Sequence, residues 1–206
     1  MVHSHVMTSS CLQIIREEHA AVSAVLRSLL MLIDNGPGDQ PERFFDVLRA
    51  MLFYIDEFPE KRHHPKESNL LFPRIARALP ALLPVIQRLE ADHMRGEGKV
   101  RELQHLLLAW ELIGDSRRQV FVDAASAYVS FYLEHMRTEE TELLPAAAGA
   151  LTVKEWDDLA AAFEGDRDPL AGGVRDASYD RLFTRIVLRT PAPIGAGASL
   201  NGAPGG

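Results

Sequence analysis

The chain contains the stretch His63-His64-Pro65-Lys66-Glu67-Ser68-Asn69-Leu70-Leu71-Phe72-Pro73 and repeats it, in altered form, as His135-Met136-Arg137-Thr138-Glu139-Glu140-Thr141-Glu142-Leu143-Leu144-Pro145. Each copy places a glutamate four residues after a histidine, Glu67 after His63 and Glu139 after His135. If both stretches are helical, the paired side chains project from one face, one turn apart. Imidazole and carboxylate together suit iron, manganese and zinc, so each copy is a candidate metal-binding motif.

The composition is that of a soluble protein with a real core. The chain has 206 residues, 47% of them hydrophobic, enough for one domain with or without an appendage. The net charge of -7 argues against a nucleic-acid partner, which would need a basic patch. No apolar run reaches the roughly 18 residues of a membrane span, and we expect no signal peptide. The single cysteine, Cys11, excludes an internal disulfide and fits a reducing compartment, so we expect a cytoplasmic protein.

Apolar periodicity predicts a first helix from about Ser10 to Ile33, preceded by a flexible leader at residues 1–9. Ser10 and the glutamine three residues later resemble a capping box, and His19 lies within the apolar stripe. The leader contains two histidines, for which disorder and metal capture are the alternatives: His3 and His5.

A second helix is predicted to begin at Pro41, a position where the missing N–H of proline costs nothing. Its apolar stripe continues into His63 and Glu67. Pro59 and Pro65 each remove a backbone hydrogen bond and crowd the preceding turn. We therefore expect a kink or a short break near residues 57–65.

The third predicted helix runs from about Leu82 to Ile113, with His93 and Glu97 in its stripe. A carboxylate in an apolar stripe is costly unless it is paired or bound to a cation. Two glycines flank this glutamate and would leave room for a small ligand or a close helix: Gly96 and Gly98.

A fourth helix, capped by Asp115 or Ser116, is expected to carry His135 and Glu139 and to fray before Pro145. After it, a capping box at Thr152 and Glu155 predicts a short helix within a C-terminal helical extension at residues 151–190. Residues 178–189 form an amphipathic segment, which we expect to pack on the bundle or in a homodimer rather than on a membrane. The last segment, residues 191–206, is rich in glycine, alanine and proline and is expected to be a flexible tail.

The first and third helices also match, since Glu18-His19 aligns with Asp92-His93. The chain therefore reads as two αα-hairpins, which predicts an all-α, antiparallel up-down four-helix bundle over residues 10–150. The bundle would bring seven ionisable groups to one interior, where unpaired charges would be very unstable without a cation. Seven groups suit two metals with bridging carboxylates better than one. The predicted metal ligands are His19, His63, Glu67, His93, Glu97, His135 and Glu139.

Over about residues 10–150 these residues resemble the hemerythrin-like, HHE cation-binding family. The residues on which this resemblance rests are His19, the "HHPKE…LFP" stretch, His93, and the "HMRTEE…LLP" stretch. The resemblance implies a four-helix bundle holding two irons with an oxo or hydroxo bridge, which meets O2 or a related small molecule at an open position. Zinc and manganese are the alternative metals.

The chain departs from the family's respiratory pigments at two positions. At the first, the pigments carry a second histidine on the third helix where this chain has Glu97. A carboxylate there would add negative charge, stabilise ferric iron and disfavour reversible O2 carriage. The pigments also place their last carboxylate where this chain has Glu140. We expect Glu139 to be the ligand, because it matches Glu67 in the repeat, with Glu140 as the alternative.

The expected function is binding or sensing of O2, NO or peroxide at a di-iron centre. The alternatives are an oxidoreductase that removes peroxide or NO, an iron storage or donation protein, and a structural bundle with adventitious metal, so an enzymatic role stays open. Tyr128 and Tyr132 either line the pocket or pack in the core. His64 and His105 fall off the stripes and are expected at the surface or behind the ligands, and Cys11 is expected to be an inert buried thiol.

Overall fold

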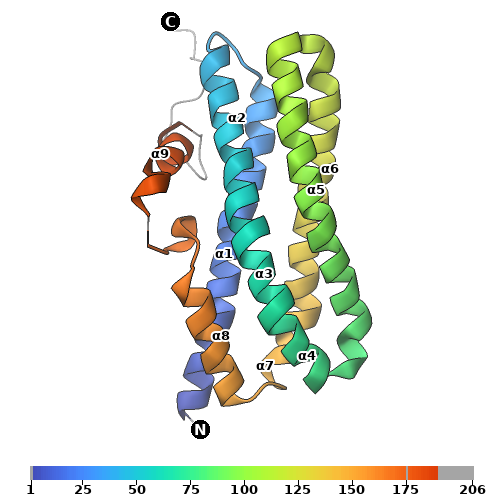
Figure 1. The fold of residues 1–206 in the computed structure, drawn as a ribbon, viewed down its shortest axis with the longest axis vertical. Coiled ribbons are helices and arrows are strands. Elements are labelled where there is room, and N and C mark those ends of the chain that lie inside the picture. The colour runs from blue at the N-terminus through green and yellow to red at the C-terminus, as the bar shows by residue number, and fades with distance from the viewer. Residues whose placement is uncertain (1, 175, 190–206) are drawn as a thin grey trace, which may run out of the picture.

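The computed structural model describes residues 2–174 and 176–189, and every regular element within these residues is helical. In this part of the chain, long helical runs lie side by side along the long axis, and two further helices cover one flank (Figure 1). The prediction of an all-α protein is confirmed. The runs are α1 (Val2–Asn35), the segment from α2 (Pro41–Ile55) to α4 (Phe72–Ala78), α5 (Leu83–Ile113), and the segment from α6 (Arg118–Thr138) to α7 (Leu144–Ala148); the flanking helices are α8 (Val153–Gly165) and α9 (Asp180–Arg189).

The first helix begins earlier than its sequence signals indicate. α1 starts at Val2, so the expected start at Ser10 is wrong, and residues 2–9, expected as a separate leader, continue the helix. The third helix matches its prediction, since α5 begins at Leu83 after a 3-10 turn, η3 (Pro80–Leu82). A second 3-10 turn, η4 (Asp115–Arg117), precedes α6.

The segment from α2 to α4 stays helical through its prolines. It passes through a π-helical stretch, η1 (Asp56–His63), then α3 (His64–Lys66), then a second π-helical stretch, η2 (Glu67–Leu71). π-Helical turns bond i to i+5, and this wider turn accommodates Pro59, whose ring would crowd the carbonyl of a regular α-helical turn. The break expected near residues 57–65 is therefore replaced by a local widening.

The same widening occurs in the second copy of the motif. α6 passes into the π-helical η5 (Glu139–Leu143) and then into α7, so the helix does not fray before Pro145. Both copies of the repeated stretch thus share one local structure as well as one sequence pattern.

The C-terminal part packs on the bundle. α8 begins with the predicted capping box, in which the Thr152 hydroxyl accepts the N–H of Glu155 and the glutamate accepts the N–H of Thr152. α9 buries Phe183, whose ring lies 5.4 Å from that of Phe58, so the expected packing on the bundle is confirmed there. Two 3-10 turns, η6 (Pro169–Ala171) and η7 (Ala177–Tyr179), connect α8 to α9. The predicted tail at residues 191–206 lies outside the described residues.

The buried apolar residues form two clusters, one towards each end of the bundle. One contains Leu26, Leu52 and Trp110, and the other contains Ile15, Phe72 and Trp156. On each long run the predicted ligands fall between the two clusters along the chain, except that Met136 of the first cluster follows His135. A polar layer is therefore buried between two hydrophobic cores. Within the described chain, no helix combines the length and apolarity that a membrane span requires.

Candidate metal centre

Four histidines enter the polar layer from four helical runs, and they meet in two pairs. His19 from α1 and His63 from η1 bring their Nε2 atoms within 3.2 Å of each other. His93 from α5 and His135 from α6 bring theirs within 3.1 Å. All four imidazoles are buried.

Two carboxylates link the two histidine pairs. Glu67 places Oε1 3.1 Å from Nε2 of His63 and Oε2 3.4 Å from Nε2 of His93. Glu139 places Oε2 3.3 Å from Nε2 of His19 and Oε1 3.3 Å from Nε2 of His135. Each carboxylate thus offers one oxygen to each pair, and the result is two half-sites of two nitrogens and two oxygens.

Three of the four imidazoles are held from behind through Nδ1. Nδ1 of His63 lies 2.6 Å from Oε2 of Glu18, and Nδ1 of His19 lies 3.0 Å from Oε1 of Glu140. Nδ1 of His93 lies 2.8 Å from the Ser68 hydroxyl. A carboxylate accepts the Nδ1–H proton, and this leaves the Nε2 lone pair facing the centre, the tautomer that a metal ligand needs.

The inward-facing atoms lack hydrogen-bond donors. Among the described residues, neither oxygen of Glu67 nor of Glu139 has a hydrogen-bond partner, and both side chains are about 1% exposed. Burial, and then the charge of Glu67, raise the pKa of Glu139 to about 8. Burial also opposes ionisation of Glu67, but electrostatic attraction to the imidazoles of His63 and then of His93 holds the pKa of that carboxyl well below its usual range. The four carboxylate oxygens and four imidazole nitrogens that converge here fit a cation site, and the mixed donor set fits borderline transition metals.

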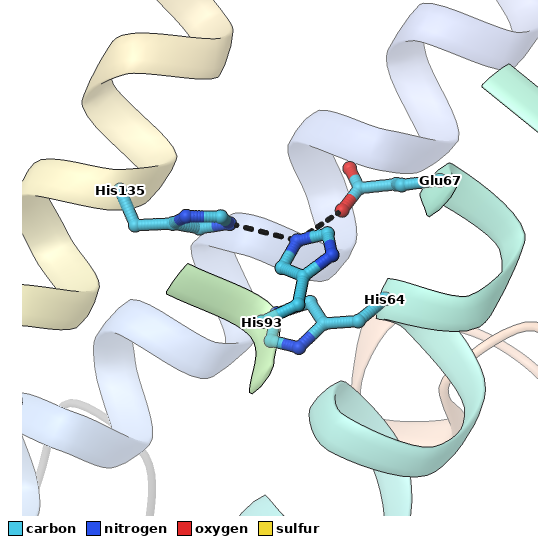
Figure 2. A group of neighbouring side chains, drawn as sticks. All are labelled: His64, Glu67, His93 and His135. Carbon is cyan, nitrogen blue, oxygen red and sulfur yellow. Dashed lines mark hydrogen bonds and ion pairs between the residues drawn. The ribbon is translucent and has the colours of Figure 1, made fainter. Parts of the chain in front are cut away.

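His64 lies beside the centre, contrary to the sequence expectation of a surface or outlying position. It is buried, and its ring stacks on that of His93 at 4.0 Å between centroids. Figure 2 shows His93 reaching between His135 and Glu67, with His64 next to it. Ligand atoms of these four residues all lie within 4.8 Å of one another. Burial, and then the charge of His93, hold the pKa of His64 well below its usual range.

Both nitrogens of His64 already have partners. Nε2 lies 2.7 Å from the Tyr132 hydroxyl and Nδ1 lies 3.1 Å from Oε2 of Glu60. Tyr128 donates its hydroxyl to Oε1 of the same glutamate at 2.9 Å. We therefore place His64 in a buried hydrogen-bonded chain alongside the metal ligands, and not among them. The two tyrosines are buried, as core packing requires, and belong to this chain.

Glu97 is the predicted ligand that the structure does not bring to the centre. Its side chain is 48% exposed and pairs with Arg101. The buried stripe of α5 instead passes from His93 through Gly96 to Val100, with spacings of three and then four residues. The expectation that Glu97 faces the interior is therefore wrong, and so is the expectation that it adds its negative charge to the centre.

Other residues behind the centre were not predicted from the sequence to support the ligands. Glu18 is buried behind His63, and its only sequence signal was its place next to His19 in the repeat. Glu140 proves to support His19 from outside, while Glu139 lies within the centre. His105 is exposed and Cys11 is buried, as expected.

The geometry thus defines a helical-bundle protein with a buried histidine and carboxylate cation site. A family model of the hemerythrin HHE cation binding domain matches residues 11–147, well over half of the chain, so this protein belongs to that family. The family resemblance seen in the sequence is confirmed. The domain that defines this family binds metal cations, typically iron. A comparison with curated proteins gives no match.

Proposed function

We propose that this protein holds two iron ions in the two half-sites and binds or senses O2, NO or peroxide there. The observation that carries the proposal is the pair of buried carboxylates, Glu67 and Glu139, whose four oxygens face four imidazole nitrogens without a hydrogen-bond donor of their own. An interior of this kind is stabilised when cations occupy it, because unpaired buried carboxylates are strongly disfavoured.

His19 and His63 would hold one iron, His93 and His135 the other, and the two carboxylates would bridge them. Iron bound in this way supplies open coordination positions and one-electron redox chemistry. The same donors accept zinc or manganese, so metal availability also decides occupancy. We further propose that the four long runs form an antiparallel up-down bundle, because successive runs are joined by short connections.

The protein itself controls what reaches the centre. A pocket beside it is lined by ligand histidines, among them His19 and His63, and by apolar groups that include Val22, Phe58 and Met136. Charged side chains, among them Arg62 and Lys66, also line this small pocket, whose size favours molecules such as O2, NO and peroxide. Bulky substrates find no such space next to the ligands.

A second candidate is an oxidoreductase acting on peroxide or NO. The contact between the Tyr132 hydroxyl and Nε2 of His64, 2.7 Å, favours it, because a phenol beside a base can pass a proton as it is oxidised. Sustained turnover by the parent, reduced in Tyr132→Phe, would select this candidate over a binding protein, which would react only once per centre.

The test is metal content and optical spectrum on one sample produced with iron available. We expect about two irons per chain, near-ultraviolet charge-transfer absorption, and a spectral change with O2, NO or azide. Glu67→Gln should lose both irons, because Glu67 serves both half-sites, whereas Glu97→Gln, an exposed control, should retain them. No iron above background in the parent would refute the proposal, and equal iron loss in the two variants would refute the ligand assignment.

A further inference from the structure

A segment that follows α8 reaches across to the metal centre. This segment, residues 166–170, is named the strap here, and it lies outside the residues that match the family model. Arg62 donates to a carboxylate oxygen of Asp166 at 3.1 Å, and Lys66 donates to the backbone carbonyl of Asp166 at 2.9 Å. Tyr54 donates its hydroxyl to the carboxylate of Asp168. These anchors come from the helical segment that also carries His63 and Glu67.

The strap contacts the residue that supports one of the ligands. The backbone N–H of Asp168 donates to Oε1 of Glu18 at 2.8 Å, and the other oxygen of Glu18 lies 2.6 Å from Nδ1 of His63. Glu18 is about 2% exposed, so solvent does not replace either donor. The orientation of His63 is therefore fixed by a carboxylate that the strap itself fixes.

Among the described residues of the C-terminal extension, none has such a connection to the second half-site. His93 is held by Ser68, from the bundle, and Nδ1 of His135 lies 3.8 Å from Asp92, also from the bundle. The strap thus contacts the support of one half-site only.

From this arrangement, which rests on the proposed function, we propose that the strap is a positioning device for the half-site of His19 and His63. The N–H of Asp168 orients Glu18, Glu18 orients His63, and the metal in this half-site is retained more firmly as a result. Release of the strap would open one half-site and leave the other closed, so the C-terminal extension gives the two metals unequal lability.

The variant that tests this is Asp168→Pro, which deletes the N–H donor. Asp168 has φ -58° and ψ 124°, values that proline adopts and that suit a residue before Pro169. The matched control is Asp168→Ala, which loses the carboxylate but keeps the N–H. If Asp168→Pro does not fold, Glu18→Gln takes its place, because a single amide oxygen cannot accept both donors.

Metal release to an excess of chelator is followed in the iron-loaded full-length chain. We expect Asp168→Pro to release one of its two metals about 10- to 100-fold faster than the parent, as loss of a supporting hydrogen bond does elsewhere, and the other at the parental rate. The metal release rates of Asp168→Ala should lie closer to those of the parent. Equal acceleration of both metals would indicate general loosening and overturn the proposal, as would unchanged release.

A measurement on the metal-free chain separates this proposal from the proposed function. In the parent, the Nδ1–H proton of His63 should be protected from solvent exchange in the NMR spectrum, because it is buried against Glu18. Asp168→Pro should lose that protection and Asp168→Ala should retain it. A parent that binds no metal would refute the proposed function, while this exchange result would still decide whether the strap positions His63.

Discussion

Gly96 and Gly98 offer a paired test of how tightly the buried chain beside the centre is held. Both lie within α5, two residues apart, and each becomes alanine in a separate variant. A Cβ added at Gly96 would lie 2.8 Å from Oε1 of Glu60, whereas a Cβ at Gly98 meets no atom of the described residues within 4 Å. The same substitution therefore probes two environments on one helix.

The magnitudes follow from two opposing effects. Replacing glycine by alanine within a helix stabilises it by about 1 kcal/mol, and both variants gain this. Only Gly96→Ala displaces Glu60, which is buried and bonded to Tyr128 and His64, and a buried polar group that loses a partner costs about 1–3 kcal/mol. We expect Gly98→Ala to be more stable than the parent by about 1 kcal/mol, and Gly96→Ala to range from neutral to about 2 kcal/mol less stable.

Urea unfolding of the metal-free proteins measures this difference, with equal m-values required for the comparison. On heating, the two variants should separate by several degrees, since about 1 kcal/mol shifts Tm by about 2–4 °C in a chain of this size. Equal stabilisation of both variants would refute the reasoning, because it would mean that Glu60 has room to move without losing its partners.

Three further predictions concern other buried or capped groups. Burial raises the pKa of the Cys11 thiol to about 12, so alkylation of this thiol by iodoacetamide should be negligible in the folded chain and rapid in urea. Rapid alkylation of the folded chain would contradict this. Burial raises the pKa of Glu60 to about 8, so ionisation of this carboxyl weakens the metal-free fold as pH rises from about 4 to 8. Over that range the free energy of unfolding of Glu60→Gln should rise relative to that of the parent by a few kcal/mol. A difference between the two proteins that does not change with pH would contradict this. Thr152→Ala removes the hydroxyl of the capping box with Glu155 and should lower the free energy of unfolding by about 1 kcal/mol, whereas Thr152→Ser should match the parent.

The sequence predicts the helical runs well because apolar periodicity and helix breakers are local signals. The gap between α1 and α2 contains two helix-breaking glycines, Gly36 and Gly38, and the capping box at Thr152 starts α8 as expected. Six of the seven predicted ligands meet in the polar layer. The strap could not be predicted, because its contacts with Glu18 join residues 150 positions apart and depend on a backbone N–H that every residue but proline carries.

Glu97 shows why one predicted position was wrong. A spacing of four residues advances a side chain by about 40° beyond a full α-helical turn, so a stripe stays on one face only when spacings of three and four alternate. Along α5 the spacing before His93 is four, from Leu89, and the next buried residue is therefore Gly96. The predicted stripe instead took a second step of four residues, from His93 to Glu97, and in the regular α-helix α5 that step leaves the buried face.

The other two copies of His-x-x-x-Glu keep both residues inside because their helices are not regular. In the second run, one series of buried positions is spaced four residues apart, and in an α-helix five such steps would drift by about 200°, to the opposite face. Wider π-helical turns cancel this drift, and η1 and η2 lie within that interval. The members of this series are Ile55, Pro59, His63, Glu67, Leu71 and Ile75, and the run also buries residues between them, such as Phe58, His64 and Phe72.

The second copy repeats this solution, since His135, Glu139 and Leu143 are all buried and η5 begins at Glu139. Widened turns therefore occur where a ligand pair must face the centre, and they are absent from the described part of α5, where a lone histidine does so. Within the described residues, a His-x-x-x-Glu pair therefore has both members buried only where the helix passes through a π-helical stretch.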